Sequence, residues 1–117
     1  MGNPVVHFEV RVNDPARLVA FYSELLGWEL GAEDGPLRYR MIDTKGDGGI
    51  GGGMVPAQAG FTAGIAVYAQ VNDIESFLEL AASLGAVGVV PPTALPNGGR
   101  FAVLRDPEGN QLGLLQS

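Results

Sequence analysis

The sequence predicts an α+β fold made of two copies of one β-α-β-β-β unit. A stretch with strand-like alternation, Val5–Val12, is followed at once by a helical pattern, and the same order begins again at Ala66. The tripeptide Val-Asn-Asp occurs at the same point of both copies, as Val12–Asp14 and as Val71–Asp73. A repeat of this kind determines the whole fold. We therefore expect a single domain, with module one at residues 1–57 and module two at 58–117.

The first strand has two unlike faces. Successive side chains of a strand point to opposite sides, which separates the apolar residues Val6, Phe8, Val10 and Val12 from the polar ones. The polar side carries His7, Glu9 and Arg11. We expect the apolar side to be covered by a helix. The polar side is typical of a solvent-facing strand or of the floor of a ligand cavity.

The rest of module one follows from helix and turn signals. Asp14 is an N-cap residue, proline suits the first helical position, and Gly27 is a left-handed terminator, so the helix is expected over Pro15–Leu26. Apolar residues recur at helical spacing within it, at Leu18, Phe21, Tyr22 and Leu25. Glycine- and proline-containing turns then separate strands expected at 28–33, 37–43 and 49–55, and a connector follows at 56–60.

Module two repeats this order. Asp73 is the expected cap of a helix that begins at Ile74, and Gly85 repeats the role of Gly27. Strands are expected at 86–90, 99–105 and 110–115, with an irregular loop at 91–97 and a turn at 106–110.

Composition excludes several classes of function. Seven Lys and Arg against thirteen Asp and Glu give a net charge of -6, which disfavours nucleic acid and anionic membrane surfaces as partners. There is no cysteine, so zinc–thiolate sites and thiolate nucleophiles are excluded. No apolar run is long enough to span a membrane and no signal peptide is visible, so we expect a cytoplasmic protein.

One glycine motif resembles a phosphate-binding loop. Gly46–Gly51 satisfies G-x-G-x-x-G, but the residues that follow include Gly52, Gly53 and Pro56 and cannot open a helix. We therefore expect no dinucleotide site.

A family resemblance spans almost the whole chain. It is carried by the segments His7–Val10, Asp14-Pro15, Phe21-Tyr22, Leu26–Trp28, Gly51–Met54 and Asp106–Asn110. These segments resemble the vicinal oxygen chelate superfamily, which includes glyoxalase I, bleomycin-resistance proteins and extradiol dioxygenases. The resemblance implies two tandem βαβββ modules that form an open, cupped mixed β-sheet with the helices outside. It also implies a homodimer.

Enzymes of that superfamily typically hold a divalent metal with two ligands from each module. Carried over, the first-strand positions are His7 and Ala66, and the last-strand positions are Gly51 and Gly113. Three of the four positions therefore lack a donor atom, and one histidine cannot build a transition-metal site. We expect no metal and no other cofactor.

Five residues are the candidate ligand-binding set: His7, Glu9, Arg11, Tyr68 and Gln70. Tyr68 and Gln70 share the strand parity of Ala66, the counterpart of His7. A purely structural role is an open alternative for each, such as a Glu9–Arg11 ion pair or cross-strand packing of Tyr68.

Three functions remain open. The first is metal-independent binding of a small organic molecule, of the bleomycin-resistance type. The second is a lyase, isomerase or dioxygenase of the glyoxalase class, with His7 or Glu9 as acid or base. The third is a domain whose main role is pairing with another chain.

Overall fold

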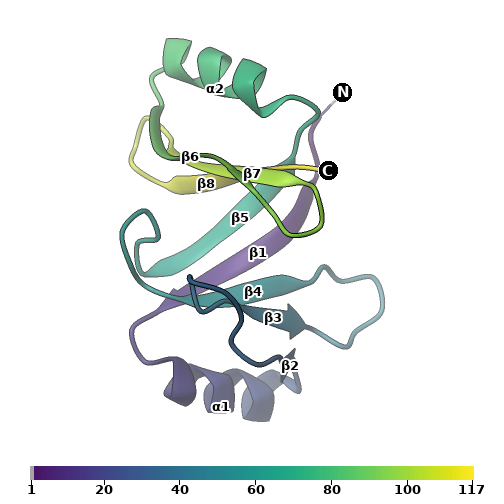
Figure 1. Cartoon of the computed structure of the whole chain (residues 1–117). Helices are drawn as coiled ribbons and strands as arrows, with labels where there is room; N and C mark the ends of the chain where they lie inside the picture. Colours follow the sequence, from purple (N-terminus) through teal and green to yellow (C-terminus); the bar gives the residue numbers. More distant parts are fainter. Residues whose placement is uncertain (1) are drawn as a thin grey trace. The chain divides into compact units, whose positions relative to one another are not determined.

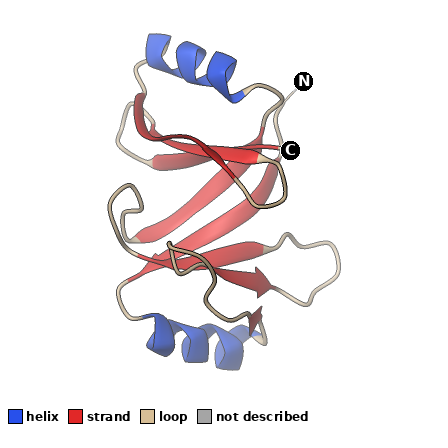
Figure 2. Cartoon of the chain, viewed as in Figure 1, coloured by secondary structure: helices blue, strands red, loops and turns tan. Residues whose placement is uncertain are grey.

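The computed structural model describes residues 2–117, which form eight strands and two helices in the order β-α-β-β-β-β-α-β-β-β (Figures 1 and 2). The predicted α+β class and the repeated order of elements are confirmed. The chain divides into two compact units. The first unit is His7–Ile65, and the second unit is residues 2–6 together with Ala66–Ser117.

The first unit packs one helix on one sheet. Its elements are β1 (Val5–Val12, with His7–Val12 in this unit), α1 (Pro15–Leu26), β2 (Glu29–Leu30), β3 (Arg40–Asp43) and β4 (Gly52–Pro56). The strands lie in the order β2-β3-β4-β1, with β1 parallel to β4 and the other pairs antiparallel. The apolar face of β1 lies in the core as predicted, where Val10 and Val12 pack with Ile42 and Met54 against Leu18 and Tyr22 of α1.

The ends of α1 also follow the prediction. The Asp14 carboxylate accepts a hydrogen bond from the backbone N–H of Arg17 at 3.3 Å. Gly27 has a φ of 69°, and its N–H donates to the carbonyl of Ser23. A left-handed conformation at this point favours glycine.

The second unit repeats this architecture. Its elements are β5 (Gly64–Gln70), α2 (Ile74–Ser83), β6 (Val87–Ala94), β7 (Arg100–Arg105) and β8 (Gln111–Gln116). The strands lie in the order β5-β8-β7-β6, and the pair β5–β8 is parallel. The core of this unit is Val71, Ile74, Ala102, Leu104 and Leu114, with Phe77 of α2 packed against it.

Four strands differ from their predicted boundaries by more than one residue. β2 and β3 are shorter than expected, because residues 31–33 are irregular and 35–38 form a turn closed by the Asp34–Tyr39 bridge. β4 begins at Gly52 and not at residue 49. β6 runs through Pro91 and Pro92, where a loop was expected; it is an edge strand with register shifts, the setting in which a sheet tolerates proline.

The start of α2 is a further correction. Asp73 stands at the N-cap, but its side chain accepts no backbone hydrogen bond and instead accepts the Ser76 hydroxyl at 2.6 Å. The backbone N–H of Ile74 donates to Oε1 of Gln116 at 2.9 Å, so β8 supplies the acceptor for the first turn. At the other end the cap is Leu84, followed by Gly85 with a φ of 98°.

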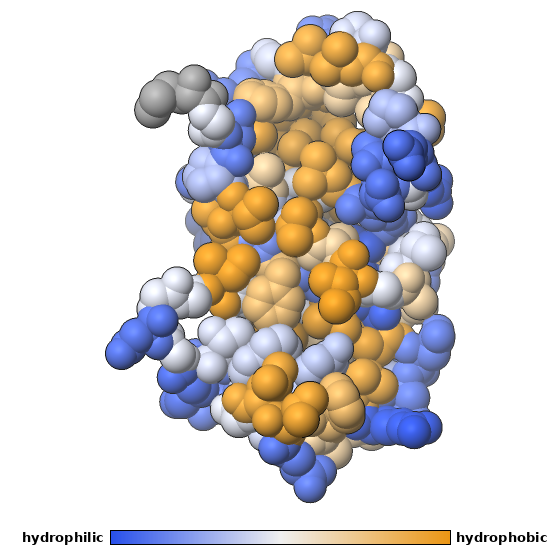
Figure 3. Space-filling model, turned by 180° about the vertical axis from the view of Figure 1, so that it is seen from behind, coloured by the Kyte–Doolittle hydropathy of each residue, from blue (hydrophilic) through white to orange (hydrophobic). Residues whose placement is uncertain are grey.

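Both units leave large apolar side chains exposed. They include Phe21, Leu25, Leu26 and Met41 in the first unit and Leu80, Leu84 and Val87 in the second. The orange surface in Figure 3 shows apolar residues on the face that it views. Within residues 2–117, no helix is both long and apolar enough to cross a membrane.

Candidate functional site

The polar face of β1 carries a buried ion pair. Glu9 is 2% exposed and Arg11 is 3% exposed, and the Arg11 Nε donates to Oε1 of Glu9 at 2.6 Å. The two residues are two positions apart on one strand, so they share a face. Removing two charges from water offsets most of their attraction, and apolar residues of the same volume would stabilise the fold equally well. Stability alone therefore does not explain why these two charges are buried.

Phe61 covers the Arg11 side of this pair. The guanidinium carbon of Arg11 lies 5.4 Å from the centroid of the Phe61 ring, within the range of a cation–π contact. Phe61 is buried and lies in the segment between β4 and β5, which bonds to the end of β1 through the N–H of Ala57 and the carbonyl of Val12 at 2.8 Å. The segment thus shields the charges from water on this side.

His7 lies on the same face of β1 and is half-buried. Its Nε2 is 2.7 Å from the hydroxyl of Tyr39. Burial lowers the pKa of His7 below its ordinary value, and the charge of Glu9 opposes this effect without cancelling it. The imidazole is therefore neutral at pH 7. A neutral imidazole has one donor and one acceptor nitrogen, so the tautomer decides whether Nε2 donates to the Tyr39 hydroxyl or accepts from it.

Tyr39 was not among the predicted site residues. Its phenol ring lies directly over Gly53 of β4, in the space that a Cβ atom at position 53 would need. A glycine inside a strand often marks close approach by another group. The run Gly51–Gly53 was a sequence signal for such an approach, but nothing in the sequence indicated which side chain makes it.

The remaining predicted residues, Tyr68 and Gln70, belong to the second unit. Tyr68 is buried, its ring lies over Gly113 of β8, and it contacts the ring of Phe101 edge-on. Gln70 is exposed and donates to the Ser117 hydroxyl at 3.3 Å. The proposal that these two share one cavity with His7, Glu9 and Arg11 remains a prediction.

The strand register corrects one expected ligand position. Glu9 is the Cα partner of Gly53, and Tyr68 is the partner of Gly113 in the same kind of parallel pair. The counterpart of Gly113 is therefore Gly53, and not Gly51 as expected. Both glycines lack a donor and both lie under a tyrosine ring, so the residues present do not fit the metal that the resemblance implies. Within residues 2–117, no three His, Asp or Glu side chains are grouped as a metal site would need.

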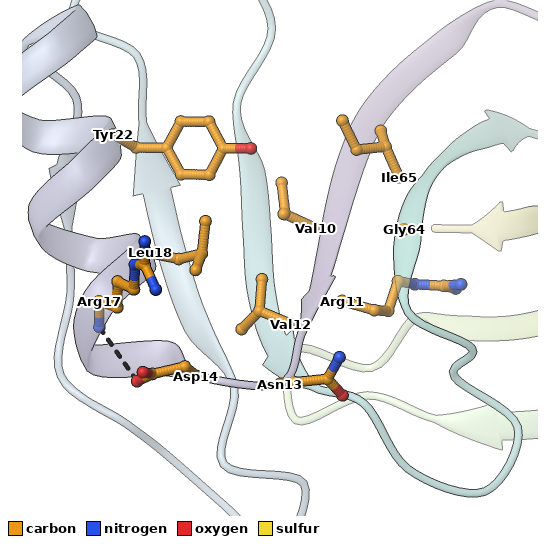
Figure 4. Close-up of a pocket in the computed structure, with 10 residues that line it drawn as sticks. All are labelled: Val10, Arg11, Val12, Asn13, Asp14, Arg17, Leu18, Tyr22, Gly64 and Ile65. Carbon is orange, nitrogen blue, oxygen red and sulfur yellow. Dashed lines mark hydrogen bonds between the residues drawn. The ribbon is translucent and has the colours of Figure 1, made fainter.

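A groove of about 410 Å³ lies on the helix-facing side of β1. It is lined by Val10, Arg11, Val12, Asn13, Asp14, Arg17, Leu18, Tyr22, Gly64 and Ile65. Figure 4 shows Tyr22 and Leu18 extending from α1 toward β1, whereas Arg11 extends away from the helix. Of the five predicted residues, Arg11 lines this groove, and His7, Glu9, Tyr68 and Gln70 do not.

Comparison with curated proteins finds relatives that are longer than this chain. The chain is 32% identical over 113 residues to "Putative glyoxylase CFP32" of Mycobacterium bovis and to the protein of the same name of Mycobacterium tuberculosis. The match covers 92% of this chain but 42% of each relative. The chain thus spans less than half the length of these curated relatives.

Solved structures share the fold at low sequence identity. A hypothetical protein, BH1468, from Bacillus halodurans has a TM-score of 0.71 at 17% identity and covers 100% of this chain and 96% of its own. The methylmalonyl-CoA epimerase of Mycobacterium tuberculosis has a TM-score of 0.70 at 16% identity, with coverage of 96% and 86%. A superfamily member from Vibrio splendidus reaches 0.68 at 17%, with coverage of 99% and 100%.

The family assignment comes from the sequence itself. Residues 5–114 match the model of the Glyoxalase/Bleomycin resistance protein/Dioxygenase superfamily, which is nearly the whole chain. The duplicated order of elements in the two units agrees with this match. The chain belongs to the Glyoxalase/Bleomycin resistance protein/Dioxygenase superfamily.

Proposed function

We propose that this chain binds a small organic molecule through the polar face of β1 and needs no metal ion to do so. The observation that carries the proposal is the buried Glu9–Arg11 pair beside the half-buried, neutral His7. Binding sites for small molecules combine a few placed polar groups with an apolar surround. Ionisable groups in an apolar environment are candidates for such a site when a specific partner accompanies them.

The polar groups of this face suit an uncharged ligand. Glu9 and Arg11 compensate each other's charge, and the lowered pKa of His7 favours an uncharged imidazole at pH 7. A ligand with its own net charge would find no free countercharge among these residues.

A thermal-shift screen of neutral organic molecules, run with a chelator present, tests the proposal. A ligand at 100 times its Kd stabilises the folded state by about 2.7 kcal/mol, which raises the Tm by several degrees in a domain of this size. The shift should vanish in the double variant His7→Gln/Glu9→Gln and persist in Glu33→Gln, whose carboxylate bonds to Arg38 at the surface. A ligand that stabilises the double variant as much as the wild type would place the site elsewhere.

An enzyme that moves a proton beside a carbonyl group is the second candidate. A neutral imidazole hydrogen-bonded to a phenol is a suitable acid–base pair at pH 7. Solved structures with this fold include methylmalonyl-CoA epimerases. Dioxygenase chemistry would require a metal site, which the residues present do not fit.

Two assays separate this candidate from binding alone. Hydrogen–deuterium exchange of methylmalonyl-CoA, followed by NMR, would detect proton abstraction, and loss of exchange in His7→Gln would assign it to this face. We expect no lactoylglutathione from methylglyoxal and glutathione, with or without added Zn²⁺ or Ni²⁺. If lactoylglutathione formed and a chelator abolished its formation, the metal-independent role would be contradicted.

We further propose that the chain forms a homodimer. Both units expose large apolar side chains that an interface would cover. Light scattering after gel filtration should give twice the mass of the chain, and a monomeric mass across micromolar concentrations would reject the dimer.

A further inference from the structure

We propose that Tyr39 takes the place of a metal ion at His7 and keeps this position closed to divalent cations. The proposal goes beyond the absence of ligand residues, because it assigns a side chain to the space that the metal and its second ligand would need. It concerns the first unit alone and does not depend on the identity of any small-molecule ligand.

The hydrogen bond between His7 and Tyr39 is the first observation. An imidazole binds a metal through the lone pair of one ring nitrogen. The Nε2 of His7 lies 2.7 Å from the Tyr39 hydroxyl, so it is already engaged, either as acceptor or as donor. A cation approaching this nitrogen would have to displace the phenol.

The position of Gly53 is the second observation. The register makes residue 53 the last-strand counterpart of residue 113, so it is the first unit's second ligand position. Any side chain there would begin at a Cβ atom that overlaps the Tyr39 ring. A single phenol therefore closes both the histidine and the position beside it.

The backbone around Tyr39 holds the phenol in this place. The N–H of Tyr39 donates to the carbonyl of Asp34 at 3.0 Å, and the N–H of Asp34 donates to the carbonyl of Tyr39 at 2.9 Å. Gln58 adds a bond from its side-chain amide to the carbonyl of Leu37 at 3.2 Å. The turn that carries Tyr39 is thus tied both to itself and to the segment after β4, and these bonds fix the backbone from which the phenol extends.

The second unit shows the same closure without the histidine. The ring of Tyr68 overlies Gly113, and the first-strand position is Ala66. Tyrosine over glycine therefore occurs at the last-strand position in both units, but only in the first unit does the phenol meet an imidazole. The group next to the His7 imidazole is therefore a neutral hydroxyl that forms a hydrogen bond, and not a positively charged metal ion.

The single histidine of the chain makes the test direct, because ¹⁵N NMR shows one imidazole without ambiguity. We would titrate four proteins with Zn²⁺: wild type, Tyr39→Phe, Tyr39→Ala and Tyr39→Ala/Gly53→Glu. Gly53→Glu is used only together with Tyr39→Ala, because its Cβ atom would by itself force the ring aside. The wild type and Tyr39→Phe should show no coordination of His7 at equimolar Zn²⁺. Affinity should rise in Tyr39→Ala and again in the double variant, which should bind Zn²⁺ at least about tenfold more tightly than the wild type, equivalent to about 1.4 kcal/mol.

Two results would overturn the proposal: coordination of His7 in the wild type at equimolar Zn²⁺, or a double variant that binds Zn²⁺ no more tightly than the wild type. Tyr39→Phe keeps the ring but removes the hydroxyl, and it tests the hydrogen bond in a protein that is expected to fold. It should shift the His7 ring ¹⁵N resonances and still not bind Zn²⁺. Unchanged His7 resonances in Tyr39→Phe would contradict the hydrogen bond and with it the proposal. The ligand screen described above can succeed or fail whatever the zinc result.

Discussion

The two units share their backbone plan but differ in what their first strands carry. Each has a parallel pair between its first and last strands, a helix on one face, and a glycine of the last strand under a tyrosine ring. In the first unit the first strand carries His7 and Glu9, and in the second unit the same positions are Ala66 and Tyr68. Duplication therefore preserved the fold, while the ionisable chemistry is concentrated in the first unit.

The contrast extends to how the buried faces are stabilised. The last residue of the polar row on β1 is the buried Arg11, whereas its counterpart on β5 is the exposed Gln70. The first unit thus keeps two charges out of water beside an imidazole, and the second unit fills the equivalent space with the buried ring of Tyr68. Charged groups are costly to bury and aromatic rings are not. Packing suffices for the second arrangement, and the proposed ligand site would explain the first.

Removing one charge of the buried pair should give the largest effect. Glu9→Ala leaves the Arg11 guanidinium buried without its carboxylate, so we expect the free energy of unfolding to fall by about 3–5 kcal/mol. Gln70→Ala, at the counterpart of Arg11, should change it by less than about 0.5 kcal/mol because the side chain is exposed. Urea denaturation of the two variants measures both values.

The double variant Glu9→Leu/Arg11→Met is the matched control. Replacing a buried pair with apolar residues of similar volume is often neutral or stabilising, so most of the loss in Glu9→Ala should be recovered. If Glu9→Ala cost no more than Gln70→Ala, the two faces would be equivalent in energy and the contrast between the units would not hold.

Much of the fold could be predicted because local signals and the global fold agree. The alternation in Val5–Val12 and the signals at Asp14 and Gly27 are local properties, and the structure matches them. The path of β6 through Pro91 and Pro92 could not be predicted, because it depends on the strand being at the edge of its sheet. The hydrogen-bond acceptor of the Ile74 N–H could not be predicted either, because Gln116 is 42 residues away in the sequence.

The candidate site was predicted in part. The row of His7, Glu9 and Arg11 is visible in the sequence because strand parity alone places the three on one face. Whether the Glu9–Arg11 pair is exposed to water or buried depends on which residues cover it. One of them is Phe61, and the sequence does not show this contact because Phe61 lies fifty residues after Arg11. Tyr39 reaches His7 through a turn whose shape depends on the Asp34–Tyr39 bridge, a contact that no periodicity indicates.

The tyrosine over Gly113 gives the second prediction. A Cβ atom at position 113 would overlap the Tyr68 ring, so Gly113→Ala should lower the free energy of unfolding by about 1–3 kcal/mol, as overpacking typically does. Gly88→Ala is the matched control in the same unit, because a Cβ atom there meets nothing within 4 Å. Chemical denaturation of both variants gives the difference.

A double-mutant cycle identifies Tyr68 as the cause. Gly113→Ala should cost less in a Tyr68→Ala background than in the wild type, with a coupling energy of about 0.5–3 kcal/mol. An additive cycle would mean that Gly113 is needed for some reason other than the ring, and the parallel with Gly53 would fail.

The helix caps should differ between the units by a smaller amount. Asp14→Ala removes an acceptor from the first turn of α1 and should cost about 0.5–2 kcal/mol. Asp73→Ala should cost less, because the Asp73 side chain bonds Ser76 and no backbone group. Thermal unfolding of the two variants would show the ranking, and a larger loss for Asp73→Ala would reverse our assignment of the α2 cap to Gln116.

The pH dependence of stability should show the smallest effect, and it reports on the first unit alone because His7 is the only histidine. The pKa of His7 is lower in the folded chain than its ordinary value of 6.5, so the unfolded chain binds the proton more readily. The free energy of unfolding should therefore fall as the pH drops from about 6.5 to the folded pKa and then level off. Arg100 holds the pKa of Glu75 at about 2, so that carboxylate stays ionised throughout this range. Between pH 7.5 and 5 the urea midpoint should fall less in His7→Gln than in the wild type. If acidification instead stabilised the wild type relative to His7→Gln, the charge of Glu9 would outweigh burial in setting the pKa of this imidazole.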